Sequence, residues 1–160
     1  MTSVAEPTTN LVQIESSVLG TVAVPAASVF DFADGIHGFN GHRKFALVSG
    51  GRDGLFWLQS TRDSNLTFLL VDPFAVQGGY EVDLGPTEKR ALDVTSPDDV
   101  LLLAIVTLPA SKKETPTANL RGPVVLNVRT ARGCQSVTSD DRHSMHTPVD
   151  LLALPARAAV

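Results

Sequence analysis

The chain has 160 residues, 43% of them hydrophobic and 19% charged, which suits one packed core and excludes a disordered chain. Its formal net charge is −4, from 17 acidic and 13 basic side chains, which speaks against direct binding to nucleic acid. The single cysteine precludes an internal disulfide, and no apolar run reaches the roughly 20 residues of a membrane-spanning helix. The N-terminus lacks the pattern of a signal peptide, so we expect a cytoplasmic protein that binds no membrane.

The first quarter of the chain predicts a tail, two strands and a folded loop. Residues 1–10 are polar with no apolar period and predict a flexible tail. Residues 11–15 and 18–24 are short and β-branched, which favours strands of an antiparallel sheet. Residues 30–41, FDFADGIHGFNG, combine three glycines with three phenylalanines, so we expect an ordered loop with a buried side.

The middle of the chain predicts further strands separated by turn residues. The connector SGGRDG joins two apolar runs in the manner of a hairpin, and Asp72-Pro73 ends a later run. Residues 80–84 alternate as a half-buried strand does. The strands expected here span 44–48, 55–60, 66–71 and 80–84.

The last part predicts one short helix and three strands. Residues 86–94 begin with Pro86 and contain good helix formers. Residues 100–108, VLLLAIVTL, are typical of a central strand buried on both faces. A polar loop is expected at 109–117, followed by strands at 124–128 and 134–138.

About nine short strands with frequent turns predict an all-β fold, either a barrel or a sandwich. We adopt a single-domain, barrel-like fold of short antiparallel strands with one or two short helices. The predicted domain covers residues 11–150, between flexible tails at 1–10 and 151–160.

The residues indicate no catalytic site. The chain has no G-x-S-x-G nucleophile motif and no phosphate-binding glycine pattern, so we expect a non-enzyme without a cofactor. Cys134 as a nucleophile is the alternative, but a lone thiol inside a predicted strand is more often a small buried hydrophobe.

A metal-dependent hydrolase is the sharper alternative. His143 and His146 are three residues apart, and Asp140, Asp141 and Cys134 lie near them in the sequence. Residues 138–148 have no helical period, so a solvated loop without a metal is the favoured interpretation. The same interpretation applies to His37 and His42 in the glycine-rich loop.

Six segments in a fixed order resemble the flagellar assembly factor FliW, a bacterial family of small all-β proteins. Their order and spacing run through about 110 residues, and N-L-R-G-P-V-V-L-N is the most specific part. The segments are FADGIHGF (32–39), FWLQS (56–60), LTFLLVDPF (66–74), YEVDL (80–84), DDVLLLAIVTLP (98–109) and TANLRGPVVLNVRTARGCQSV (117–137).

The resemblance implies two protein partners. Members of this family bind newly made flagellin in the cytoplasm, and the freed protein binds the translational repressor CsrA, which relieves repression of flagellin mRNA. The two partners exclude each other, so the concentration of free flagellin sets which complex dominates. A more limited possibility is that this chain keeps only the binding of flagellin.

Candidate interface residues follow from polar groups in apolar strands and from aromatic side chains near loops. Arg121 is the best suited anchor, whereas Gln59 and Asn127 are more often structural at such positions. Core packing is also an open alternative for the aromatic residues. The candidates are Phe39, Gln59, Asp72, Phe74, Tyr80, Asn119 and Arg121.

Overall fold

The structure is a computed structural model that describes residues 10–138 and 141–154 of the chain. The tails proposed at 1–10 and 151–160 fall mostly outside this range. The strands are β1 (Leu11–Ser16), β2 (Gly20–Pro25), β3 (Val29–Asp31), β4 (Lys44–Ser49), β5 (Leu55–Ser60), β6 (Thr67–Val71), β7 (Val100–Thr107), β8 (Thr117–Asn127), β9 (Arg132–Gln135) and β10 (Thr147–Pro148). The helices are α1 (Pro73–Val76) and α2 (Pro86–Leu92), with 3-10 turns η1 (Ala26–Ser28) and η2 (Pro97–Asp99).

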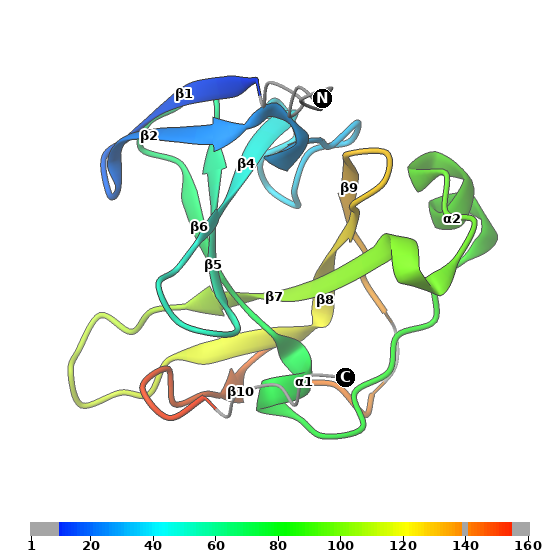
Figure 1. Ribbon diagram of the computed structural model, residues 1–160. Helices are drawn as coiled ribbons and strands as arrows, with labels where there is room; N and C mark the ends of the chain where they lie inside the picture. Colours follow the sequence, from blue (N-terminus) through cyan, green and yellow to red (C-terminus); the bar gives the residue numbers. More distant parts are fainter. Residues whose placement is uncertain (1–9, 139–140, 155–160) are drawn as a thin grey trace, which may run out of the picture.

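Seven strands close into a barrel in the order β8-β7-β6-β5-β4-β3-β9, and β9 pairs back to β8 (Figure 1). Neighbouring strands are antiparallel except β3 and β9, which meet through one parallel pair, Asp31 and Arg132. The two-residue strand β10 extends the sheet beyond β8. The predicted all-β, barrel-like fold with short helices is therefore confirmed.

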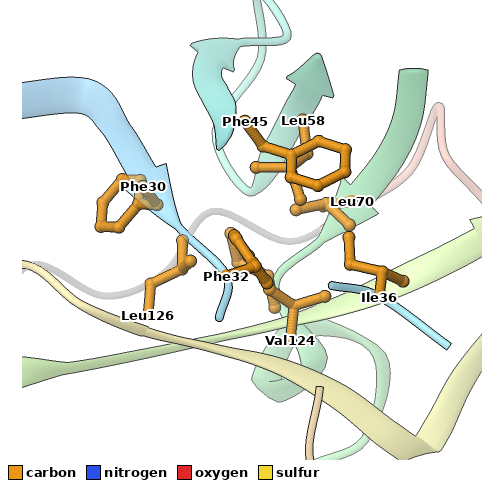
Figure 2. Packing of buried hydrophobic residues seen from close by; sticks show 9 residues of the cluster. Phe30, Phe32, Ile36, Phe45, Leu58, Leu70, Val124 and Leu126 are labelled. Carbon is orange, nitrogen blue, oxygen red and sulfur yellow. The ribbon is translucent and has the colours of Figure 1, made fainter. Parts of the chain in front are cut away.

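The barrel interior is filled by aromatic and branched aliphatic side chains. Alternate residues of a strand point to opposite faces, so each strand contributes every second residue to this core. Phe32 and Phe45 meet edge to face, with ring centroids 5.3 Å apart. Figure 2 shows the side chains converging from several strands. The buried members are Phe30, Phe32, Ile36, Phe45, Leu58, Leu70, Leu103, Val124 and Leu126.

A second apolar cluster covers the outer face of the barrel over β6, β7 and β8. Leu69 and Val71 belong to it, whereas Leu70 between them points into the barrel. Tyr80 and Val149 come from segments outside the barrel and close this cluster. The segment around Tyr80 and the segment around Val149 are therefore packed parts of the domain.

The β1–β2 hairpin packs on the outside of the barrel, at the top of Figure 1. Ile14 and Val24 are buried against Ala46 of β4, and this contact forms a third, small cluster. The predicted strands at 11–15 and 18–24 correspond to this hairpin.

The predicted strand at 124–128 is the second half of β8, which is 11 residues long. The pairing of β8 with β7 shifts register at Ala104, between the pairs Leu103–Val124 and Ile105–Asn119. This irregularity accommodates Gly122-Pro123, since proline has no N–H to donate to a regular ladder. The polar residues before Val124 concealed the first half of the strand.

The strand predicted at 80–84 is wrong. Residues 80–84 have no strand partner, and their alternation arises because single side chains are buried from an irregular segment. Tyr80 is 2% exposed, and its hydroxyl donates to the Leu120 carbonyl at 2.6 Å. The alternation of apolar and polar residues at 80–84 therefore reflects side chains that anchor the segment to the barrel, and not the pairing of a strand.

Four other local features differ from the sequence prediction. The glycine-rich loop begins later, because Val29–Asp31 form β3. Asp72-Pro73 does end a strand, but it also starts α1, where the Asp72 carboxylate accepts from the Phe74 N–H at 2.9 Å. The helix predicted at 86–94 is α2, which ends at Leu92 because Asp93 adopts φ 57°. The last predicted strand, 134–138, is β9 at 132–135.

The turn between β8 and β9 holds the C-terminus of α2. Buried Asn127 donates through Nδ2 to the Leu92 carbonyl at 2.7 Å and the Asp93 carbonyl at 3.2 Å. Thr130 also donates to the Leu92 carbonyl, and Arg132 donates to the Ala91 carbonyl. These donors satisfy carbonyls that a helix end leaves without partners, and the charge of Arg132 complements the helix dipole.

Candidate functional site

A groove lies where β6 ends and β7 continues with β8 as its only neighbouring strand among the described residues. Pairing between these strands covers only Leu69–Val71 with Ala104–Val106. The first half of β7, Val100–Leu103, therefore extends beyond β6 toward α2 (Figure 1). We call the depression beside Val100–Leu103 the β7 groove. Burial on both faces, which we predicted for all of 100–108, is wrong here because Val100, Leu101 and Leu102 are only half-buried.

The β7 groove has two compartments. The smaller, about 430 Å³, is lined by the β4–β5 turn, Asp72 and the side chains of Phe56, Leu101 and Leu103. The larger, about 760 Å³, lies between α1 and α2, and Leu101 lines both. Its apolar lining includes Phe74, Val82, Leu84, Val94, Val100 and Leu102. Asp83 and Lys89 supply its charged side chains.

The wall formed by residues 82–84 is held from behind by an aromatic cluster. His143 is 5% exposed; its Nε2 lies 2.9 Å from the Glu81 carbonyl and its ring centroid 4.7 Å from that of Tyr80. Because a carbonyl only accepts, Nε2 carries the proton in this contact. Phe74 packs edge to face on Tyr80, with centroids 5.8 Å apart. Burial raises the pKa of Tyr80 to about 12.

The opposite wall is held by Asp99. Its carboxylate accepts from the Thr95 N–H at 3.1 Å, the Ser96 N–H at 3.2 Å and the Arg129 Nε at 3.4 Å. Donation from the Thr95 backbone is the main cause that lowers the pKa of Asp99, and burial opposes it. Thr95 and Ser96 line the groove, so Asp99 ties this wall to the β8–β9 turn.

Two of the predicted interface residues line the β7 groove. Phe74 is 37% exposed in the larger compartment and is available to a partner. Asp72 borders the smaller compartment, but it is 6% exposed and its carboxylate caps α1. Tyr80 lies beneath Phe74 and is buried, so it supports the wall and offers no surface.

Gln59 is fully buried and serves the fold. Its Nε2 donates to the Ser60 and Asp63 carbonyls, and its Oε1 accepts from the Thr67 hydroxyl. Asn127 plays a similar part in the β8–β9 turn. The structural interpretation of both residues therefore agrees with the geometry, and the Gln59 side chain cannot reach a partner.

Asn119 and Arg121 lie on a separate surface, at the bend of β8. The Asn119 Oδ1 accepts from the N–H groups of Arg121 and Gly122, which shapes the bend. Arg121 donates to the Thr138 carbonyl at 3.3 Å and pairs with Asp141 at 2.9 Å, and its side chain is 34% exposed. Both residues are therefore at least partly engaged within the chain.

Phe39 forms a third exposed position, on the glycine-rich loop. It is 39% exposed and packs edge to face on Phe68, with centroids 5.3 Å apart. Gly35 adopts φ 68° and approaches Asn40 so closely that a Cβ would lie 2.7 Å from its Cα, which fixes the loop. The structure thus distributes the predicted residues over three separate surfaces, apart from Gln59, which is buried.

The residues of the hydrolase alternative do not form a joint site. His143 is buried, so the predicted solvated loop is wrong at this residue, whereas His146 is exposed. Asp141 pairs with Arg121, and Asp140 lies outside the described residues. Within residues 10–138 and 141–154, no three His, Cys, Asp or Glu side chains gather in a group able to hold a metal ion. Burial raises the pKa of Cys134 to about 11, which opposes a nucleophilic thiolate.

The residues that sequence reasoning missed are Val100–Leu103 and the wall residues Val82 and Lys89. One signal was present in the sequence. The apolar run that forms β7 is longer than the run that forms β6, which Asp72-Pro73 cuts short. A strand that outlasts its neighbour leaves part of its edge without a partner.

Comparison with known proteins identifies the family. A family model described as "FliW protein" matches residues 13–149. The chain belongs to the FliW family. A FliW flagellar assembly factor from Treponema denticola is 33% identical over 141 residues, 88% of this chain and 94% of that protein. One from Treponema pallidum is 34% identical over 130 residues, 81% of this chain and 86% of the relative.

A solved structure extends the comparison to the fold. The crystal structure of a flagellar assembly factor FliW superposes with a TM-score of 0.77 at 28% identity, covering 86% of this chain and 96% of that one. The family expected from the six sequence segments is thus confirmed. In the described part of the chain, no helix has the length and apolar character needed to cross a membrane.

Proposed function

We propose that this chain is a non-enzymatic, cytoplasmic flagellar assembly factor that binds flagellin and, when free, binds and antagonises the translational repressor CsrA. Antagonism of CsrA would relieve repression of flagellin mRNA. The observation that carries the proposal is the FliW match over residues 13–149, which takes in nearly the whole described domain.

The geometry supports a binding protein. The described residues present a groove that is lined by both apolar and polar side chains and includes the exposed ring of Phe74, whereas the titratable residues of the hydrolase alternative are dispersed. Apolar depressions with a few charged side chains at the rim are the usual form of a protein-binding surface. Phe39, Phe74, Asn119 and Arg121 are the proposed contact residues that keep at least part of their side chain accessible.

Co-elution with flagellin tests the first half of the proposal. Purified protein and the terminal helical region of flagellin are mixed at micromolar concentration and separated by size. We expect one complex, weakened by Phe74→Ala and unaffected by Leu152→Ala, because both side chains are exposed but only Phe74 lines the groove. Separate elution of wild-type protein and flagellin would overturn flagellin binding.

Competition tests the second half. CsrA is titrated into the protein with and without excess flagellin, and binding is followed by calorimetry. We expect CsrA to bind free protein and to be excluded as flagellin saturates it. If flagellin binds and CsrA does not, the chain keeps only the flagellin activity. If both partners bind at once, the proposed competition is wrong.

A further inference from the structure

The first half of β7 presents an unpaired strand edge inside the groove. Val100–Leu103 pair with Asn127–Val124 of β8 on one side, whereas pairing with β6 on the other side begins only at Ala104. Among the described residues, the Val100 N–H donates to the Pro97 carbonyl, and no other hydrogen bond beyond the β8 ladder reaches the backbone of Val100–Leu103. Apart from the Val100 N–H, alternate residues of this stretch therefore direct N–H and C=O groups into the groove.

The two compartments flank this edge in the pattern of a strand. Side chains alternate between the faces of a sheet, so Leu103 borders the smaller compartment, whereas Val100 and Leu102 border the larger. Leu101 separates the compartments and contacts both. A strand added beside β7 would place its own side chains alternately toward one compartment and the other.

We propose that the β7 groove binds an extended peptide segment of a partner protein, which adds a strand to the unpaired edge of Val100–Leu103. The segment carries apolar side chains at alternate positions. This goes beyond the proposed function, because it assigns a binding mode to the groove whatever protein supplies the segment.

The chemistry of the groove favours an extended segment over a helix. A helix satisfies its own backbone groups, so it would cover the N–H and C=O groups of β7 without pairing them, and each buried unpaired group is costly. An extended segment pairs them and fills the compartments as well, which is the known logic of strand addition. Four edge residues span roughly 13 Å, enough for a segment of about four to six residues.

Charged side chains border both compartments. Arg52 and Asp53 border the smaller compartment, and Asp83 and Lys89 border the larger, so each face of the edge offers one charge of either sign beside apolar side chains. We therefore expect a segment whose alternating apolar side chains are accompanied by polar or charged residues that can pair with these groups.

A phage-displayed library of random octapeptides tests the mode without flagellin or CsrA, so its failure leaves the proposed function untouched. We expect enrichment of peptides with apolar residues at every second position. A synthetic copy of the best peptide, added to isotope-labelled protein, should shift the amides of Val100–Leu103 and protect those that still lack a partner. Absence of enrichment, helical spacing of the apolar residues, or shifts confined to other surfaces would each overturn the proposal.

N-methylation of the peptide backbone supplies the matched control. Methyl groups on the alternate amides that face β7 should weaken binding at least about tenfold, because the hydrogen bonds to the edge are lost. Methyl groups on the other set, which face away, should leave binding within about twofold. Equal effects of the two sets would overturn strand addition.

A protein variant checks the position of the site. Val100→Lys places a charge at the groove and should abolish detectable binding of the peptide, whereas Val18→Lys, at the exposed tip of the β1–β2 hairpin, should not change it. The thermal midpoint of each variant is measured alongside. Unchanged binding to folded Val100→Lys protein contradicts the proposal.

Discussion

The barrel has two weak junctions, and they differ in how they are completed. At the β3–β9 junction, one residue pair joins the strands, yet the junction is sealed. The Asp31 N–H donates to the Ala131 carbonyl at 2.8 Å, and Gly133 lies against the ring of Phe32. At the β6–β7 junction, three pairs are followed by an unpaired edge and the β7 groove.

The difference shows that the number of strand pairs at a junction does not by itself decide whether a groove forms there. The β3–β9 junction has fewer pairs than the β6–β7 junction, but side chains and the β8–β9 turn fill it. The β6–β7 junction is bordered by segments that are held apart, one by Tyr80 and His143 and the other by Asp99. Interactions outside the ladders therefore close one junction and keep the other open.

Asn127→Ala should have the largest effect, because it removes the support of the sealed junction. The side chain is fully buried and makes four hydrogen bonds, two to the Leu92 and Asp93 carbonyls at the C-terminal end of α2 and two from the N–H groups of Arg129 and Thr130. Loss of these partners should lower the free energy of unfolding by about 3 kcal/mol, measured by guanidinium denaturation.

Asn40→Ala is the matched control, since Asn40 is exposed on the glycine-rich loop. It should change stability by less than about 0.5 kcal/mol. Equal effects of the two substitutions would contradict the assigned role of Asn127.

Gly133→Ala tests the close approach at the same junction. A Cβ at this position would lie 2.6 Å from the Phe32 ring and 3.0 Å from Leu126 Cδ2, so the core must shift. We expect a loss of about 2 kcal/mol of unfolding free energy. Gly78→Ala is the control, because a Cβ there meets no atom within 4 Å, and its stability should stay close to wild type.

Tyr80 reports on the wall of the open junction. It is the only tyrosine in the chain, so ultraviolet absorbance of tyrosinate follows this residue alone. The native midpoint should lie near the raised pKa of about 12, against 10.0 for an unburied tyrosine. Because the folded state holds this proton more tightly, its stabilising contribution is complete below pH 10 and is lost as pH rises toward 12.

Tyr80→Phe separates the hydroxyl from the ring. It should cost about 1 kcal/mol, since the buried Leu120 carbonyl loses its donor, and it should flatten the alkaline loss of stability. An unchanged alkaline slope would show that Cys134, whose pKa is also raised, dominates this range.

The sequence predicted the paired strands of the barrel better than the segments around the β7 groove. Alternating and buried apolar runs located most strands, because burial of one face imposes the period that a reader can see. The 80–84 segment broke this rule, since Tyr80 is buried and Val82 is half-buried from an irregular backbone. The first half of β8 was not predicted as a strand because it contains Asn119, Arg121 and Pro123. These residues lie at a bend that follows from the pairing with β7 and not from the local sequence.

The candidate site was predictable only in part, for a physical reason. Phe74 was proposed as an aromatic side chain near a loop, and it lines the β7 groove. Gln59 and Arg121 have the same polar character in sequence, yet one is fully buried and the other is partly exposed. The groove itself exists because β6 ends before β7 does. This depends on how the two strands pair, so the sequence of either strand alone does not predict it.

Val100→Lys should have the smallest effect on stability and so sharpens the comparison most directly. Val100 is half-buried at the unpaired edge, and the lysine stem can lie along the groove while its charge reaches water. We expect a loss below about 1 kcal/mol in guanidinium denaturation, less than for either substitution at the sealed junction. A larger loss would mean that the open edge is a structural part of the barrel. A small loss, together with abolished peptide binding, would mean that this stretch of β7 is kept for a partner, because its contribution to the fold is then minor.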